Sequence, residues 1–473
     1  MVRPDECPVI PLGSLCLFNA VRAWVSALKA MLKVINPKAA AADVGSEDIY
    51  ASIAGGPPER FGTVTRELHR LRDWLLSHSV DSFAMEFTGV YWIALFEVLE
   101  KTSIRVCLVN GAHVKTLPGR KTDVADCMWL AELHSHGLLR PGFVPPPAIR
   151  RLRDYMRLRE NHVAQGSTCL LQAQKALELM NIKVHDVISD LAGVSGQKMI
   201  RAILEGEKRP EVLIALCDPR ILERKRQRLL DALEGTWAEQ HLFALKQAWQ
   251  GWEFSRRLML DCDREIERIL PTLPKSPQLP DGQTGGEPSR GKRPSKNSPQ
   301  IEGLHQQLLT LLPGRDPTLI LGIGDQSLMQ LISEVGTDLG AFATKYRFTS
   351  WLGLAPGKQN SGKQKKNRSR KGGRAGQIFR VLAQTVGRAK DSALAGFYRR
   401  IRAQRGGLVA NKALARKLAE FYYDAMTKGM RYVEAGLEKG EQRYREQATK
   451  KLEALSRKFG YRLVKESDPI PAT

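Results

Sequence analysis

The sequence predicts an α/β domain near the N-terminal end of the chain, followed by a helical connector and a second, mostly α-helical domain. Three observations support this fold class. Short apolar runs alternate with helix-like segments over residues 36–147, which is typical of α/β folds. Apolar residues at helical spacing dominate residues 148–273. Helical spacing returns over residues 301–430, after a stretch rich in Pro, Gly, Ser and Lys.

The α/β domain follows an N-terminal extension, residues 1–35. In order along the domain, the sequence predicts strands at residues 44–53, 60–65, 82–86 and 104–109 and helices at residues 67–78, 90–100 and 123–136. Asp5 and Glu6 stand where a signal peptide has basic residues, and no apolar run is long enough to span a membrane. We therefore expect a cytoplasmic protein.

The rest of the chain is expected to be mostly helical. Within the connector, residues 224–270 predict a long antiparallel helix pair or a coiled coil, although a solvated helical face is the favoured explanation of their alternating charges. Residues 274–300 contain no periodic apolar positions, which predicts a disordered linker. Residues 431–473 form a charged helical tail.

The charge balance indicates the kind of partner. The 473 residues include 73 Lys and Arg against 50 Asp and Glu, a formal net charge of +23. Such a surplus indicates a polyanionic partner, most often nucleic acid, without separating DNA from RNA.

The composition also excludes two classes of protein. A hydrophobic content of 42% excludes a wholly disordered chain. The seven cysteines are scattered and no Cys-x-x-Cys occurs, which argues against a disulfide framework or a zinc ribbon.

Four carboxylates of the α/β domain stand where they can converge. Asp43 lies at the front of the first expected strand and Glu86 ends another, while Asp123 and Asp126 share one face of the last expected helix. Each residue alone has an ordinary explanation, such as a helix cap at Asp123. Four converging carboxylates repel each other unless cations neutralise them, and Mg²⁺ prefers oxygen ligands. The ordered set therefore favours a Mg²⁺ site, where two ions ~3.5–4 Å apart would clamp a phosphodiester.

A basic loop contains the second set of candidate residues. Residues 357–380 include nine Lys or Arg and no acid, and a loop that only binds phosphates explains this charge. The basic residues expected to bind nucleic acid are Lys363, Lys365, Lys366, Arg368, Arg370, Lys371 and Arg374. Ser361 is the candidate nucleophile, activated by nearby cations, although its spacing does not rank it above Ser350 or Ser369.

A glycine-rich turn precedes this loop. Leu321-Gly322-Ile323-Gly324-Asp325 resembles a helix-hairpin-helix turn, in which glycines let backbone N–H groups approach a phosphate. An ordinary turn between two helices explains the same residues equally well.

Five segments occur in a specific order over residues 36–430. They are Ala-Ala-Asp43-Val-Gly, Met-Glu86-Phe-Thr-Gly-Val-Tyr91, Lys121-Thr-Asp123-Val-Ala-Asp126, Gly322-Ile-Gly324, and Trp351-Leu-Gly-Leu-Ala-Pro356 through Ser361-Gly362. Together they resemble the DEDD-type insertion-sequence transposases of the IS-one-ten (IS110) family. Cys127 stands where this family usually has Ala, and Leu321 where it commonly has Pro.

The resemblance implies a RuvC-like, ribonuclease-H-like domain, a helical connector and a second catalytic domain. On this pattern Asp43, Glu86, Asp123 and Asp126 bind Mg²⁺, and Ser361 attacks the DNA backbone and holds the cut strand as a phosphoserine. The resemblance also implies a structured guide RNA encoded by the element, and an oligomer in which one subunit's RuvC-like site meets another's serine. Two alternatives stay open: a metal-dependent nuclease that uses only the carboxylates, and a nucleic-acid-binding protein without enzymatic activity.

Overall fold

A computed structural model describes most of the chain. The described residues are 33–86, 89–109, 111, 123–279, 296–356, 373–389, 392–430, 442, 445–446 and 449–461. The chain divides into two compact units, Met1–Val144 and Pro145–Thr473, which are considered separately. Among the described helices, none is long and apolar enough to cross a membrane.

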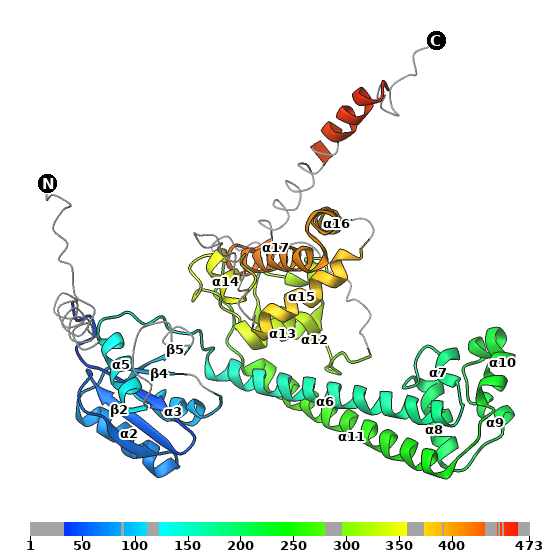
Figure 1. Cartoon of the computed structure of the whole chain (residues 1–473), viewed down its shortest axis with the longest axis horizontal. Coiled ribbons are helices and arrows are strands. Elements are labelled where there is room, and N and C mark those ends of the chain that lie inside the picture. The colour runs from blue at the N-terminus through cyan, green and yellow to red at the C-terminus, as the bar shows by residue number, and fades with distance from the viewer. Residues whose placement is uncertain are drawn as a thin grey trace, which may run out of the picture. The chain divides into compact units, whose positions relative to one another are not determined.

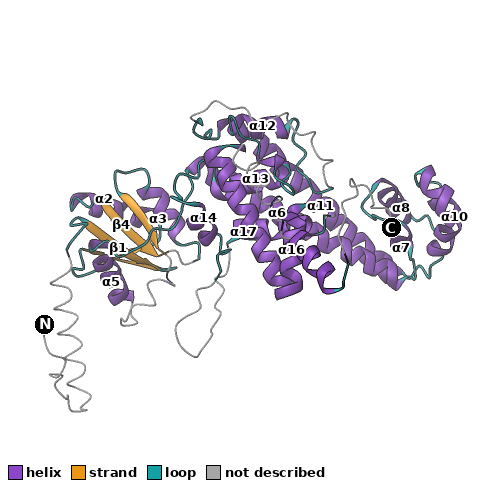
Figure 2. Cartoon of the chain, turned by 90° about the horizontal axis from the view of Figure 1, so that it is seen from above, coloured by secondary structure: helices purple, strands orange, loops and turns teal. Residues whose placement is uncertain are grey.

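The first unit contains a five-stranded mixed sheet, drawn in orange in Figure 2. Its strands are β1 (Ala39–Val44), β2 (Asp48–Ile53), β3 (Glu59–Gly62), β4 (Ser82–Glu86) and β5 (Arg105–Val109), in the spatial order β3-β2-β1-β4-β5. β1, β4 and β5 are parallel to one another, while β2 runs antiparallel to both β1 and β3. The predicted α/β class is confirmed at this level.

Helices cover both faces of this sheet. α2 (Thr65–Ser77) and α3 (Trp92–Leu99) pack on one face, against residues such as Ala40 and Phe83. α5 (Asp123–Ser135) packs on the other face, against Ala41 and Ala84, and Figure 2 shows it across the sheet from α2 and α3. Side chains alternate between the two faces along each strand, so the buried strand residues divide between two cores.

The sequence-based prediction of the first strand was wrong. Residues 44–53 were expected to form it, whereas the structure has β1 at Ala39–Val44, a turn, and then β2 at Asp48–Ile53. The run Ala39–Ala42 has poor strand propensity, but all four side chains are fully buried between the two helical layers. Burial on both faces favours small residues here and overrides propensity. Asp43 therefore lies near the end of a strand and not at its front.

The second unit is built around two long helices, α6 (Pro147–Leu179) and α11 (Glu239–Ile269), which lie side by side in Figure 1. They are antiparallel, because Arg159 contacts Asp263 while Gly166, about two turns later on α6, approaches Ser255, about two turns earlier on α11. Residues 224–270 were expected to contain such a pair, but the partner of α11 comes from 147–179. The short helices between them, α7 (Val184–Val187), α8 (Val194–Leu204), α9 (Pro210–Ile214) and α10 (Pro219–Leu233), form one core with the far end of the pair.

The C-terminal part of this unit is a helical bundle. It contains α12 (Leu304–Leu311), α13 (Asp325–Val335), α14 (Lys345–Trp351), α15 (Arg374–Gly387), α16 (Ala393–Arg405) and α17 (Gly407–Lys428), with short 3₁₀ turns at Leu270–Thr272 and Pro317–Leu319. Phe348, Phe379 and Tyr422 pack their rings together at its centre. On α6, Arg157 donates two hydrogen bonds of 2.9 Å to Glu334 of α13, so the bundle is fixed to the connector.

The described ends of the expected linker are packed. Ser276 is 4% exposed, and its hydroxyl accepts a 2.7 Å hydrogen bond from Nη1 of the buried Arg315. The backbone N–H of Gln300 donates to Asp263 Oδ2 at 3.1 Å. The prediction of a disordered linker over residues 274–300 is therefore wrong at these positions, while residues 280–295 lie outside the described part of the chain.

Candidate active site

Two of the candidate carboxylates lie on neighbouring parallel strands. The register pairs Ala41 with Ala84 and Ala42 with Met85, so the next pair is Asp43 and Glu86. Ala41 and Ala84 both face α5, and residues two positions further along a strand return to the same face. Asp43 and Glu86 therefore share the α5 face at the carboxyl ends of β1 and β4. Ligands of open parallel sheets bind at such ends.

The direction of α5 brings its first turns to the same edge. His134, near its last residue, has Nε2 2.7 Å from the hydroxyl of Ser82, the first residue of β4. Asp126 lies eight residues earlier, ~12 Å along a helix, while Glu86 lies four residues beyond Ser82, ~13 Å along a strand. Measured along the strand direction from the contact of His134 with Ser82, Asp126 therefore lies at about the same position as Glu86.

The chemistry of Cys127 supports this placement. Burial first, then the negative charge of Asp43 and to a smaller extent that of Asp126, raise the pKa of its thiol to about 11. The Cys127 side chain is fully buried, and Asp126 beside it is exposed. A carboxylate on β1 and one on α5 thus both lie close enough to raise the pKa of the same thiol.

A glycine completes the edge, and the sequence analysis missed it. A Cβ atom at Gly111, two residues beyond β5, would overlap the carboxylate of Glu86. Only a residue without a side chain lets the chain leave β5 this close to the carboxylate. The signal available in the sequence was a glycine just after a buried strand, next to the edge where the carboxylates lie.

The remaining candidates are placed only in part. Asp123 begins α5, but its side chain lies outside the described residues. Ser361 also lies outside them, as do Lys363, Lys365, Lys366, Arg368, Arg370 and Lys371. Arg374 is described: it begins α15, and its Nη1 lies 3.0 Å from Glu160 Oε2 on α6. The structure therefore brings Asp43, Glu86 and Asp126 to one edge and tests no other candidate.

The helices α14 and α15, on either side of residues 357–372, contact each other. A Cβ atom at Gly376, in the first turn of α15, would overlap the carbonyl oxygen of Leu352 at the end of α14. Arg380 Nη2 also lies 3.5 Å from the carbonyl oxygen of Gly353. The end of α14 and the first turns of α15 therefore lie side by side, and Arg374 links the start of α15 to the connector.

The glycine-rich turn has a packing role. Gly322 adopts a φ of +94°, which favours glycine, and a Cβ there would lie 2.5 Å from Val386 Cγ2 of α15. Gly324 precedes α13 in extended conformation. The need for glycine at position 322 is therefore explained by helix packing, as an ordinary turn between helices requires.

The described carboxylates fit a divalent metal by the chemistry of their donors. All three offer carboxylate oxygens, the ligands that Mg²⁺ and Mn²⁺ prefer. Within the described residues, the ligand atoms of Asp43, Glu86 and Asp126 do not all lie within 4.8 Å of one another. Three carboxylates at one edge repel each other, so a cation is needed to draw them together.

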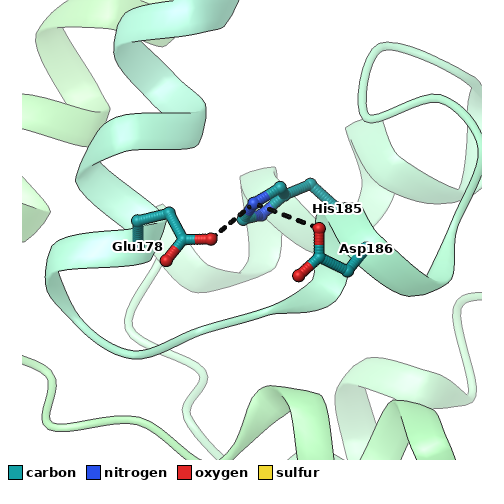
Figure 3. A group of neighbouring side chains, drawn as sticks. All are labelled: Glu178, His185 and Asp186. Atoms are coloured by element: carbon teal, nitrogen blue, oxygen red, sulfur yellow. Dashed lines mark ion pairs between the residues drawn. The ribbon is translucent and has the colours of Figure 1, made fainter.

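A second acidic group lies at the tip of the connector and is shown in Figure 3. His185 Nε2 lies 2.9 Å from Glu178 Oε1 and 3.8 Å from Asp186 Oδ1. The ammonium group of Lys183 also contacts Glu178, and both acids are exposed. These contacts are explained as a surface network of ion pairs at the C-terminal end of α6.

Comparison with known families supports the class of protein. Residues 43–182 match the IS110 DEDD model described as a transposase, and residues 318–399 match the model of the Transposase IS116/IS110/IS902 family. The first match begins at Asp43 and spans the carboxylate edge, and the second spans the basic loop. They support a DNA transposase that depends on a divalent metal. Both matches point to the IS110 family of these enzymes. No curated protein matches the chain.

Proposed function

We propose that the protein is an insertion-sequence transposase that cuts and rejoins DNA strands with a Mg²⁺ site and a serine nucleophile. The observation that carries the proposal is the edge of the first unit. There the β1–β4 register and the direction of α5 bring Asp43, Glu86 and Asp126 together. Asp123, three residues before Asp126, is the fourth proposed ligand.

The carboxylates hold and orient the metal ions in this proposal. Asp43 and Glu86 project from rigid strands, and Gly111 lets the backbone beyond β5 approach Glu86. Asp126 is exposed, so a DNA strand has access to its side of the edge. When bound, divalent ions neutralise the scissile phosphate and stabilise the charge that develops on the attacking and leaving oxygens.

Ser361 is the proposed nucleophile. Its hydroxyl oxygen forms a bond to phosphorus and loses its proton, while the bond from phosphorus to the leaving deoxyribose oxygen breaks and that oxygen gains a proton. The phosphoserine conserves the phosphodiester bond energy, so rejoining reverses the step without a further energy source. Lys363, Lys365, Lys366, Arg368, Arg370, Lys371 and Arg374 supply positive charge for the phosphates.

A structured RNA encoded by the element is the proposed guide, and the active form is a homo-oligomer. The net charge of +23 supports binding of polyanions in general. The choice of RNA and of an oligomer rests on the family resemblance. The carboxylates and Ser361 belong to different compact units of the chain, which is compatible with sites shared between subunits.

A denaturing gel tests the nucleophile. The purified protein is incubated with Mg²⁺, element-end DNA and the flanking noncoding RNA, and protein–DNA adducts are detected for wild type, Ser361→Ala and Ser369→Ala. Ser369 is a matched control, because it lies in the same basic loop. We expect an RNA-dependent adduct that Ser361→Ala alone abolishes. Cleavage without an adduct would favour the carboxylate-only nuclease, and binding without cleavage would favour the non-enzymatic protein.

A further inference from the structure

The corner between α16 and α17 projects from the helical bundle. All residues from 402 to 409 are exposed, and they include the last turn of α16 and the first residues of α17. The chain reverses at Gly406, whose φ is +82°. The corner lies beyond residue 399, where the family match ends. Neither the carboxylate edge nor the basic loop includes it.

The helices that lead to this corner are strongly basic. The described residues 373–389 and 392–405 include no Asp or Glu. Their arginines are Arg374, Arg380, Arg388, Arg399, Arg400, Arg402 and Arg405. On the neighbouring α17, Glu420 pairs with Arg416, and Asp424 pairs with Lys345 and Lys428. Within the described part of the chain, neither Arg402 nor Arg405 forms an ion pair with a carboxylate.

Two exposed apolar residues at the start of α17 form the tip of the corner. Leu408 is 92% exposed and Val409 is 46% exposed, directly after the pair Gly406-Gly407. Arginines in the last turn of a helix favour its dipole, and single exposed apolar residues are common. Neither explanation accounts for an almost fully exposed leucine beside two arginines without an ion pair, on a corner where residues 402–409 are all exposed.

We infer that this corner is a second contact surface for duplex DNA, in which Arg402 and Arg405 bind backbone phosphates and Leu408 enters the minor groove against a base step. Arg402 and Arg405 are three residues apart and share one helix face, so they can follow one strand. Apolar wedges flanked by basic residues are a known way to bind and bend B-form DNA from its minor groove. The wide, shallow minor groove of A-form RNA offers no comparable fit. The inference rests on the proposed function, which requires duplex DNA.

Salt-dependent binding tests the arginines. Full-length wild type and the double variant Arg402→Gln/Arg405→Gln are titrated with a short fluorescent duplex at several salt concentrations. The slope of log K against log salt is negative, and loss of two phosphate contacts should make it shallower by about 1.8. The matched control is Arg264→Gln/Arg268→Gln, which removes the same charge from exposed arginines that pair with Asp261 and Glu265. A slope that falls equally in both variants, or in neither, overturns the inference.

Base unstacking tests the leucine. The duplex carries 2-aminopurine at successive steps, and its fluorescence is measured at saturating protein. We expect an increase with wild type that is lost in Leu408→Ala and kept in Leu171→Ala, a control leucine on α6 that is 66% exposed. The salt slope should not change in Leu408→Ala. Both variants should keep the wild-type melting temperature, since both side chains are exposed.

Two other outcomes would assign the corner to a different binding partner, and either would overturn the inference. Equal losses with duplex RNA of the same sequence would assign the corner to RNA. A change of oligomeric state in Leu408→Ala, without any effect on DNA, would assign the tip to a second copy of the chain. Adduct formation at Ser361 is measured separately, so failure of the corner and failure of the proposed chemistry give different results.

Discussion

At the scale of single residues, the candidate site depends as much on small side chains as on charged ones. Glu86 holds its carboxylate where a side chain on residue 111 would otherwise be, and Gly111 supplies that space. Cys127 fills the fully buried position under Asp43 and Asp126. The acids were recognisable in the sequence by their residue type. Gly111 and Cys127, which lie next to these acids, were not recognisable in the sequence. A glycine or a cysteine acquires such a role only from the fold.

Replacing Gly111 tests the position of Glu86. In Gly111→Ala the new methyl group displaces the end of a flexible side chain, so we expect little change in melting temperature. Metal-dependent DNA cleavage should fall on the order of 10- to 100-fold, because misplaced catalytic groups are costly. Gly166→Ala is the control, since its Cβ would make an ordinary contact of 3.5 Å with Ser255. Equal activity of the two variants would mean that Glu86 needs no such placement.

The buried His134 predicts how stability depends on pH. Burial first, and then the positive charge of Arg105, lower the pKa of its imidazole to about 4. The folded pKa lies below the unfolded value of about 6.5, so stability is complete above that pH and falls as the pH drops from 6.5 towards 4. The loss amounts to roughly 2–4 kcal/mol at the low end. Thermal melts of wild type and His134→Asn between pH 7 and 4.5 should show a steeper decline for wild type.

At the scale of elements, local patterns predicted the helices and the strands β4 and β5 better than the central strand β1 and the helix pairing. β4 occupies the predicted residues, Ser82–Glu86. β1 was missed because four buried alanines lack both a strand-like pattern and strand propensity. The partner of α11 was misassigned because pairing between distant helices leaves no trace in local periodicity. It is fixed by long-range contacts such as Arg159 with Asp263.

This buried ion pair sets the register of α6 and α11. Arg159 Nε lies 2.5 Å from Asp263 Oδ1, and both side chains are 2% exposed. Removing one partner leaves a buried charge, so Arg159→Met should lower the free energy of unfolding by about 3–5 kcal/mol. The double variant Arg159→Met/Asp263→Leu should recover most of that loss. Chemical denaturation measures all three proteins.

The exposed pair Arg268–Glu265 on α11 is the control for this cycle. Arg268→Met should cost less than about 1 kcal/mol, as exposed pairs contribute little. A double variant at the buried pair that is no more stable than Arg159→Met would show that packing around the two side chains matters more than their charges.

At the scale of the whole molecule, the proposed catalytic groups are distributed over two compact units. The carboxylate edge lies in the first, and the basic loop and the α16–α17 corner lie in the second. Binding and strand cleavage should therefore be separable by mutation, because most of the positive charge proposed to hold nucleic acid is remote in sequence from the acids proposed to hold metal.

Asp126→Asn tests this separation. Because Asp126 is exposed, the fold should tolerate the change, and the affinity for duplex DNA and its salt slope should stay at wild-type values. Strand cleavage in Mg²⁺ should fall by on the order of 100-fold or more, since a bound ion contributes several kcal/mol to transition-state stabilisation. Binding that weakens in parallel with cleavage would instead assign Asp126 a structural role.

The central claim is that the edge formed by β1, β4 and α5 binds divalent metal, and Mn²⁺ titration followed by electron paramagnetic resonance tests it most directly. It needs neither DNA nor a guide. The protein is compared with Glu86→Gln and with Glu97→Gln, whose exposed side chain lies on α3 on the other face of the sheet. We expect Mn²⁺ binding in wild type and Glu97→Gln and at least about tenfold weaker binding in Glu86→Gln. Equal Mn²⁺ affinity in all three proteins would contradict the account.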